Sequence, residues 1–285
     1  MQYVVNGTVV PADQATLGVR DLAILRGYGI FDYFLFEEFR PLFFDQYLNR
    51  FFRSADRMNL DMPYSREELT RQILDLIATN GEKRGGIRLV LTGGYTEDGY
   101  SPARPNLLIM QYPMPGHPDS CYREGVKLLT HPYRREVPDV KTINYLMGIQ
   151  MLPRLRASGA KELLYHDGAQ ISESTRSNFF MVTQDDVLVT PAEGMLYGIT
   201  RHHILDIANT EMKVEERDVP LDELANIKEA FLTGSTKKVM PVVGINRMVV
   251  GNGRPGPVTK RLMKAYQERC EAFLEEKLKK SEVRG

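Results

Sequence analysis

Cysteine is scarce in this 285-residue chain, whose two cysteines, Cys121 and Cys270, lie far apart in the sequence. They make no disulfide framework, so we expect a reducing, cytoplasmic environment. Neither sign of charge is in excess, because 37 Lys and Arg balance 37 Asp and Glu. Net charge therefore gives no reason to expect binding to nucleic acid or to an anionic membrane.

Long apolar runs and metal-binding patterns are missing too. No apolar stretch approaches the roughly 18 residues of a membrane span, and MQYVVNGTVV lacks the basic and apolar segments of a signal peptide. The five histidines form no HExxH and no CxxC occurs, so we expect no dedicated metal site. The composition, 42% apolar and 26% charged, is ordinary for a soluble globular protein with room for two domains.

Strand and helix patterns both occur in the first part of the chain. YVVNGTVV alternates around Asn6-Gly7, which predicts a hairpin. Apolar residues recur at helical spacing over 44–58, and a capping box at Ser65 predicts a helix over 65–80. IRLVLTG and NLLIMQY predict strands.

The segment PMPGHPDS is rich in Pro and Gly and predicts a boundary between domains. After it, short strands in ELLYHD, NFFMVT, VLVTPA and EAFLTG alternate with helices in GITRHHILDIAN and 258–278. We therefore expect an α+β (mixed α/β) fold with a small N-terminal α/β domain over 1–114, a linker at 115–120 and a larger C-terminal domain over 121–285.

The stretch VPDVKTINYLMGIQ places Lys141 after a Val-Pro-Asp turn and directly before an apolar, helix-like run. Most lysines are solvated surface charges, so this position alone says little. Its companions along the chain say more. Glu173 follows in GAQISESTRSNFF, and further on come YGITRHH and FLTGSTKKVMPV.

In these motifs the chain resembles the class IV aminotransferases, the fold-type-IV pyridoxal-phosphate family of branched-chain aminotransferases, D-amino acid aminotransferases and aminodeoxychorismate lyases. The resemblance covers nearly the whole chain, from VNGTVVP through GYGIFDYF and YLNRFFRSA to GNGRPGPVTKRLMKAY. It implies a two-domain fold, pyridoxal 5'-phosphate as cofactor, and amino acids and 2-oxo acids as substrates. It also implies a homodimer in which the partner's small domain covers the pocket.

The resemblance makes Lys141 the lysine whose amine bonds covalently to the cofactor aldehyde and later moves a proton at the substrate Cα. Glu173 becomes the carboxylate that pairs with the pyridine nitrogen; from composition alone it is a loop glutamate that caps a backbone N–H. Tyr145 matches a family tyrosine near the ring hydroxyl. Its alternative role is core packing, because Leu146 and Ile149 follow at helical spacing.

Arg50 matches the family's phosphate-binding arginine, in the segment Tyr47-Leu48-Asn49-Arg50-Phe51. An arginine fork suits phosphate. The helical pattern of 44–58 instead places Arg50 off the apolar stripe, as a solvated charge. Tyr47 stands where the family has a histidine, which is a departure from the pattern.

Two more segments match phosphate-binding positions. Gly198 precedes a helix whose first amides, at Ile199 and Thr200, suit an anion. Ser235 and Thr236, in TGSTKK, match a second turn that faces phosphate and carboxylate. Without the resemblance, the first segment is as well explained as a loop-to-helix junction and the second as a plain turn.

The substrate positions depart from the branched-chain pattern. This chain has Arg26 and Gly86 where branched-chain enzymes carry pocket tyrosines, and Phe31 and Asp32 replace the family's Phe-Glu, whereas the strand arginine is kept as Arg88. The D-amino acid pattern is broken as well. Its carboxylate trap, an arginine and a histidine in the loop after this strand, is absent from GGYTEDGYSP, which offers Asp98 and Tyr100 instead.

Arg26 and Arg88 then have two interpretations. They form structural ion pairs, with Asp32 or Glu97, or they bind substrate carboxylates together with Lys237. Two cations suit dicarboxylates such as 2-oxoglutarate and glutamate, and loss of two pocket tyrosines disfavours a branched-chain specialist. The expected substrate-binding residues are Arg26, Phe31, Arg88, Thr236 and Lys237.

We therefore expect a D-amino acid transaminase with an atypical, arginine-based carboxylate site. A branched-chain L-amino acid aminotransferase is the alternative. A lyase resembling aminodeoxychorismate lyase and a scaffold protein without catalysis are the further possibilities.

Overall fold

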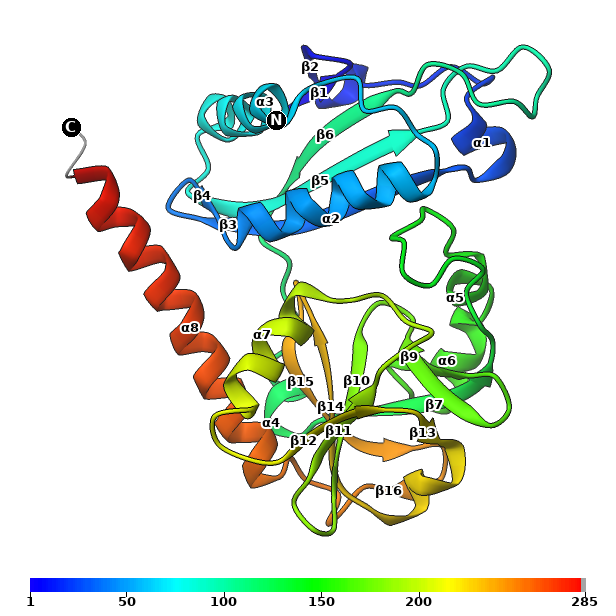
Figure 1. Cartoon of the computed structure of the whole chain (residues 1–285), viewed down its shortest axis with the longest axis vertical. Helices are drawn as coiled ribbons and strands as arrows, with labels where there is room; N and C mark the ends of the chain where they lie inside the picture. Colours follow the sequence, from blue (N-terminus) through cyan, green and yellow to red (C-terminus); the bar gives the residue numbers. More distant parts are fainter. Residues whose placement is uncertain (283–285) are drawn as a thin grey trace. The chain divides into compact units, whose positions relative to one another are not determined.

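The computed structural model describes residues 1–282, with side chains described up to Glu276. It confirms the expected α+β class and divides into two units (Figure 1). Unit 1 comprises Met1–Pro115, Val140–Asn144 and the stretch that begins at Phe273, and unit 2 comprises Gly116–Asp139 and Tyr145–Ala272. The first boundary, between Pro115 and Gly116, falls within the predicted linker at 115–120. The segment 140–144 differs from the predicted domains, because it pairs with a strand of unit 1.

Unit 1 is built on an antiparallel six-stranded sheet in the order β2-β1-β6-β5-β3-β4. The predicted hairpin at Asn6-Gly7 is confirmed, since β1 and β2 pair across it. The strands are β1 (Gln2–Val5), β2 (Thr8–Pro11), β3 (Gly29–Glu37), β4 (Arg40–Pro41), β5 (Arg84–Thr92) and β6 (Leu107–Tyr112). The helices are η1 (Ala12–Gln14), α1 (Leu22–Arg26), α2 (Phe44–Arg57) and α3 (Arg66–Asn80).

The two faces of this sheet differ. On one face α2 packs along β3, and α3 packs on β1 and β6, so that Phe34 and Phe36 are fully buried. Both helices confirm their predictions, and α3 begins with the expected capping box at Ser65. The other face carries the alternate residues of the same strands. We call it the aromatic face, and its members used below are Tyr3, Phe31, Tyr33, Arg88 and Tyr112.

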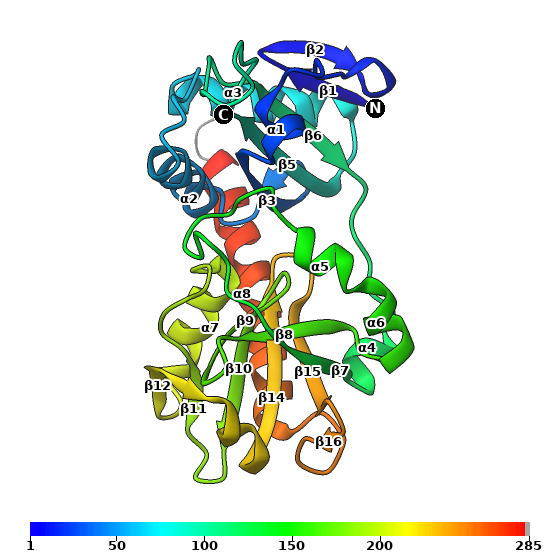
Figure 2. The ribbon, with the colours of Figure 1, turned by 90° about the vertical axis from the view of Figure 1, so that its right-hand side faces the viewer.

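Unit 2 contains a ten-stranded mixed sheet (Figure 2). Its path runs β12-β11-β10-β14-β15-β7-β8-β9-β13, and β16 pairs with β15. Phe179, Phe180 and Phe231 are fully buried in it. The strands are β7 (Val126–Pro132), β8 (Glu162–His166), β9 (Gln170–Ser174), β10 (Asn178–Thr183), β11 (Leu188–Pro191), β12 (Val214–Arg217), β13 (Val219–Pro220), β14 (Ile227–Gly234), β15 (Lys238–Ile245) and β16 (Met248–Val249).

The helices of unit 2 include the continuation of the VPDVKTINYLMGIQ motif. Its apolar run breaks into two short helices, and Pro153 lies in the first turn of the second one, where proline is tolerated. The helices are α4 (Ser120–Arg123), α5 (Leu146–Gln150), α6 (Leu152–Ser158), α7 (Ile199–Ala208), η2 (Leu221–Asn226) and α8 (Pro257–Glu282), the last of which begins in this unit. None of the described helices combines the length and hydrophobicity of a membrane crossing.

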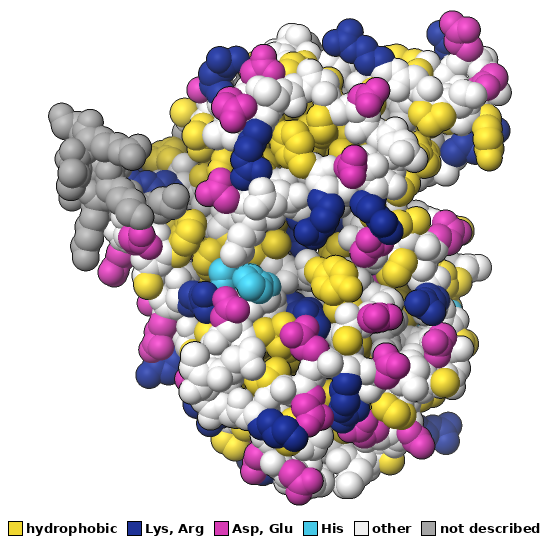
Figure 3. Space-filling view, viewed as in Figure 1, with side chains coloured by type: hydrophobic (Ala, Val, Ile, Leu, Met, Phe, Trp, Pro, Cys, Tyr) yellow, Lys and Arg dark blue, Asp and Glu magenta, His cyan; other side chains and the backbone are white. Residues whose placement is uncertain are grey.

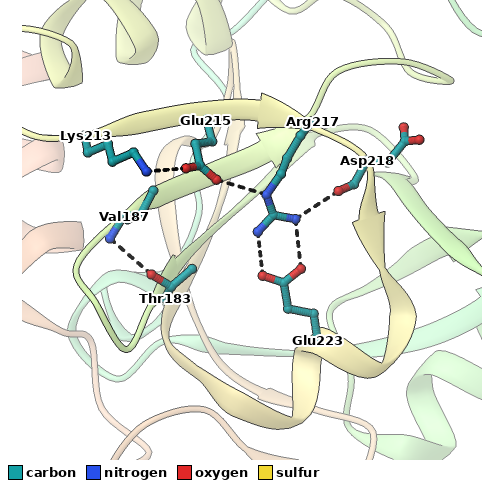
Figure 4. Close-up of polar contacts among 7 residues, drawn as sticks. All are labelled: Thr183, Val187, Lys213, Glu215, Arg217, Asp218 and Glu223. Atoms are coloured by element: carbon teal, nitrogen blue, oxygen red, sulfur yellow. Dashed lines mark hydrogen bonds and ion pairs between the residues drawn. The ribbon is translucent and has the colours of Figure 1, made fainter.

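A charged network fastens the edge of this sheet (Figure 4). Arg217 of β12 donates to both carboxylate oxygens of Glu223 in η2, at 2.9 and 2.6 Å, and to Glu215 at 3.1 Å. Lys213 pairs with Glu215 at 2.6 Å. The hydrogen bond to Glu223 is the main reason that the pKa of Arg217 lies above its usual range. The network ties β12 to η2 and involves none of the predicted site residues.

Candidate active site

Lys141 is held against the start of β3 within unit 1. Its carbonyl accepts the N–H of Phe31 at 2.9 Å, and Ile143 N–H donates to the carbonyl of Gly29 at 3.1 Å. Its half-buried ammonium lies 4.7 Å from the centre of the Phe31 ring, within the range of a cation–π contact. The backbone pairing explains why this short segment is positioned by unit 1.

Arg88 lies on the aromatic face, and three rings surround its guanidinium. The Cζ atom is 5.4 Å from the ring centre of Phe31, 5.8 Å from that of Tyr33 and 5.5 Å from that of Tyr112. Within the described part of the chain, Arg88 makes no ion pair, and the residue is exposed. Phe31 therefore contacts both cations, so the structure brings Lys141, Phe31 and Arg88 together.

Arg26 ends α1, where Gly27 adopts a positive φ of 66° as the C-cap. Its side chain is exposed and donates to the carbonyl of Leu25 at 2.9 Å. Its Nη2 lies 3.8 Å from the position that a Cβ on Gly99 would take. Arg26 therefore lies beside the loop after β5, and no described carboxylate pairs with it.

Asp98 accepts hydrogen bonds within the loop after β5 and holds that loop together. Its carboxylate accepts hydrogen bonds from the Thr96 hydroxyl, the Tyr100 amide, and both the amide and the hydroxyl of Ser101, at 2.6–2.8 Å. The bonds from Ser101 are the largest cause of a pKa held below the usual range of an aspartate. The acceptors of Asp98 are thus used within its own loop.

Arg50 and Asp32 form a buried ion pair in unit 1. Arg50 Nε donates to Asp32 Oδ2 at 2.9 Å and Nη2 to Oδ1 at 2.7 Å, a two-pronged geometry with both side chains almost fully buried. The expectation that Arg50 is a solvated charge is wrong, because Asp32 receives it on the helix-covered face of β3. Pairing of Asp32 with Arg26 or Arg88 is likewise not found, since Asp32 pairs with Arg50.

Glu173 lies at the end of β9 in unit 2 and is 6% exposed. Its Oε2 accepts the amide of Leu196 at 3.1 Å, so the backbone-capping alternative is observed. Its Oε1 accepts Arg135 Nε at 2.6 Å, and Arg135 also donates to the carbonyl of Pro138. Sequence reasoning missed Arg135. Its place shortly before the Val-Pro-Asp turn is the signal that could have pointed to it.

The N-terminus of α7 lies shortly after Leu196, whose amide donates to Glu173. The N-cap residue is Gly198, and no side chain caps the helix. A Cβ at Gly198 would lie 2.1 Å from Asn178 Oδ1, so any other residue there would require the Asn178 side chain to move. Thr200 is buried, with its hydroxyl 3.4 Å from that of Tyr266, and Ile199 is half-buried. The predicted Ile199–Thr200 pair therefore begins a helix without a side-chain cap.

Ser235 and Thr236 are half-buried in the turn between β14 and β15. The next residue corrects a prediction, because Lys237 is 2% exposed and its ammonium lies 2.6 Å from Glu162 and 2.9 Å from Ser177 Oγ. The Lys237 ammonium, which we expected to bind substrate, is instead held in a buried ion pair with Glu162. Lys237 fastens the turn to β8.

Glu162, which the sequence did not single out, is the centre of that cluster. It accepts Ser174 Oγ at 2.7 Å as well as the Lys237 ammonium, and Arg176 lies 3.4 Å away. Burial would raise the pKa of Glu162, but Lys237 and then Arg176 outweigh it and lower the pKa to about 2. Glu162 is therefore ionised at neutral pH, as the paired ammonium requires.

The predicted residues fall into two sets, one in each unit. Unit 1 holds Lys141 near Arg88, while Arg26 and Arg50 lie elsewhere in it, and unit 2 holds Glu173, Tyr145 and the two predicted phosphate segments. Acidic and basic side chains are interspersed over the visible faces (Figure 3), in line with their equal numbers. The functional groups in these two sets are the Lys141 amine, the buried Glu173 carboxylate, the amides at the uncapped start of α7 and two exposed arginines.

Comparison with known proteins gives consistent matches. The family profile described as Amino-transferase class IV matches residues 29–245. A D-alanine aminotransferase of Bacillus licheniformis is 27% identical over 274 residues, which cover 94% of this chain and 96% of that protein. The solved branched-chain amino acid aminotransferase of Escherichia coli is 26% identical with a TM-score of 0.86, and the match covers 94% of this chain and 93% of that one.

A second solved structure shows a related protein with a bound ligand. It is a T.th. branched-chain amino acid aminotransferase in complex with N-(5'-phosphopyridoxyl)-L-glutamate, 25% identical with a TM-score of 0.86. The match covers 95% of this chain and 94% of that one.

Proposed function

Since the chain belongs to the class IV aminotransferases and is an aminotransferase, we propose that it moves amino groups between D-amino acids and 2-oxoglutarate, with pyridoxal 5'-phosphate as its cofactor. The observation that carries the substrate proposal is Arg88. Its guanidinium is exposed, surrounded by three rings, and shares Phe31 with the Lys141 ammonium. A cation in that place, with no described carboxylate on it, suits a substrate carboxylate.

The donor set fits the proposed cofactor. When bound, pyridoxal phosphate draws electrons out of the bond that breaks at the substrate Cα. Lys141 would hold the cofactor covalently and, once displaced, take and return the proton at the substrate Cα. Glu173 would accept a hydrogen bond from the ring nitrogen, and the Arg135 guanidinium, at 2.6 Å, fixes the orientation of that carboxylate. Tyr145 would serve the ring hydroxyl.

The phosphate group has matching donors in the same unit as Glu173. The amides at Ile199 and Thr200 begin a helix that no side chain caps, and helix N-termini bind anions. Ser235 and Thr236 would add hydroxyl and amide donors from a turn that Lys237 fastens. The family resemblance adds Arg50 of unit 1 to this set, and Asp32 fixes the plane of its guanidinium.

Two arginines would bind the carboxylates of the substrate. Arg88 and Arg26 would bind the carboxylates of glutamate and 2-oxoglutarate, Phe31 would line the pocket, and Thr236 would offer a donor. Neither arginine makes an ion pair in the described part of the chain, so a structural role does not account for their charge. Lys237 is left out of this set because Glu162 holds it.

A branched-chain L-amino acid aminotransferase is the second candidate. The two solved structures described above, which are branched-chain enzymes, favour it. The exchange of its pocket tyrosines for Arg26 and Gly86 disfavours it, because an apolar side chain gains little beside a guanidinium.

Half-reactions separate these candidates. We expect the holoenzyme to lose the absorbance of its aldehyde-form cofactor faster with D-alanine and D-glutamate than with the L-forms, as the proposed D-amino acid transaminase requires. The two arginines should also make glutamate a better substrate than leucine, because glutamate carries a second carboxylate. The measurement is a stopped-flow spectrum with D- and L-alanine, glutamate and leucine. D-alanine should release one equivalent of pyruvate in this half-reaction, and added 2-oxoglutarate should restore the starting spectrum and allow repeated turnover.

Faster conversion of L-leucine would reject the D-specific proposal in favour of the branched-chain enzyme. Failure to form pyruvate from D-alanine, with or without 2-oxoglutarate, would point to a lyase, which yields pyruvate only from its own substrate. We also propose a homodimer, as the family resemblance implies; sedimentation of fully active protein as a monomer would refute it.

A further inference from the structure

Tyr33 and Gly86 fit together on the aromatic face of unit 1. Tyr33 of β3 pairs directly with Arg88 of β5, and Gly86 lies two residues along the same strand, on the same face. A Cβ built on Gly86 would lie 1.8 Å from Tyr33 Oη and 2.3 Å from its Cζ. The hydroxyl of Tyr33 therefore rests directly on the backbone of Gly86, where any side chain would exclude it.

Gly86 is required here for space and not for backbone conformation. Its φ lies outside the positive range, so an L-residue could adopt the same backbone. A glycine inside a strand costs about 0.5–1 kcal/mol relative to alanine. The missing side chain leaves room for the Tyr33 ring, which reaches across from the neighbouring strand.

Two hydrogen-bond donors meet at this place. The Arg88 Cζ atom is 5.8 Å from the ring centre of Tyr33 and 5.5 Å from that of Tyr112. Tyr112 is the partner of Gly86 in the β5–β6 pairing, and the Tyr33 hydroxyl lies over Gly86. Burial is the largest cause of a raised pKa for Tyr33, so its hydroxyl keeps its proton at neutral pH. Among the described residues neither the hydroxyl nor the guanidinium has a carboxylate partner.

We infer that Tyr33 is a specificity-determining residue whose hydroxyl, seated over Gly86, binds a substrate carboxylate jointly with the Arg88 guanidinium. A guanidinium and a phenol offer one donor to each carboxylate oxygen. The rings of Phe31 and Tyr112 hold the guanidinium in place. The inference rests on the proposed function in taking Arg88 as a substrate-binding arginine.

The test uses glutarate, a dicarboxylate that has no amino or oxo group to react. Titration calorimetry on the holoenzyme measures its affinity for the wild type and for Tyr33→Phe, which removes only the hydroxyl. We expect binding to weaken about 10- to 100-fold, the usual effect of one hydrogen bond to a charged group. Gly86→Ala should weaken it similarly, because its methyl group displaces Tyr33. In steady-state assays, KM for 2-oxoglutarate should rise with little change in kcat.

Tyr3→Phe is the matched control, because Tyr3 lies on the same face, with its ring 6.2 Å from that of Tyr112. It should leave glutarate affinity unchanged. Equal affinity in Tyr33→Phe and the wild type, or no glutarate binding by the wild type, overturns the inference. Weakened glutarate binding without any transamination by the wild type would instead reject the proposed function and leave the carboxylate site standing.

Discussion

Lys141→Ala is expected to lower kcat for transamination by at least about 10⁴-fold, the upper range for loss of a general acid–base group. The same amine is proposed to hold the cofactor and to move the proton at the substrate Cα, so one substitution removes two functions that act as a unit. The measurement is turnover of D-alanine with 2-oxoglutarate by the purified variant, followed through pyruvate.

The variant should fold, because the pairing of this segment with β3 uses the backbone of Lys141 and not its side chain. Lys264→Ala is the control, since that lysine is 80% exposed on α8, and it should keep full activity. Retention of more than a few per cent of turnover in Lys141→Ala would reject the proposed role.

Lys237→Met is expected to lower the free energy of unfolding by about 3–5 kcal/mol, the usual cost of breaking a buried ion pair from one side. The variant leaves the Glu162 carboxyl buried without its ammonium partner. Removing both charges, with Glu162→Leu and Lys237→Met together, should recover most of the loss, because no buried charge then remains unpaired. Urea unfolding of the three proteins at pH 7 gives the comparison.

The matched control is the exposed pair between Lys228 and Asp186, where Lys228→Met should cost less than about 1 kcal/mol. Acid provides a further check. The folded-state pKa of Glu162, about 2, lies below its ordinary value of 4.5. The stabilisation of the folded state by the ionised Glu162 carboxylate is therefore fully present above about pH 4.5 and is lost as pH falls towards 2. A single variant as stable as the wild type at pH 7 would show that the pair is not a stabilising contact.

The local patterns of the sequence predict much of the fold. The helices at 44–58 and 65–80 and the hairpin at Asn6-Gly7 appear where local chemistry places them. The apolar run after Lys141 is different. Leu146 and Ile149 are 70% and 63% exposed in the structure. Their helical spacing predicts that they share one face of a helix, but it does not predict whether another part of the chain packs on that face.

The site shows the same division between local and long-range information. Arg50 looks solvated on its helix, since nothing local reveals that Asp32 lies opposite it across the core. Lys237 looks available for substrate, since its partner Glu162 is far away in the sequence. Tyr33 was not singled out because its importance comes from the absent side chain of Gly86 on the neighbouring strand.

The central claim is that the amine of Lys141 bonds to the cofactor, and peptide mapping tests it most directly. The holoenzyme is reduced with borohydride, which makes the bond permanent, and is then digested and analysed by mass spectrometry. We predict a phosphopyridoxyl mass on the peptide that contains Lys141 and on no other. The same mass on a different lysine, or on none, would contradict the account.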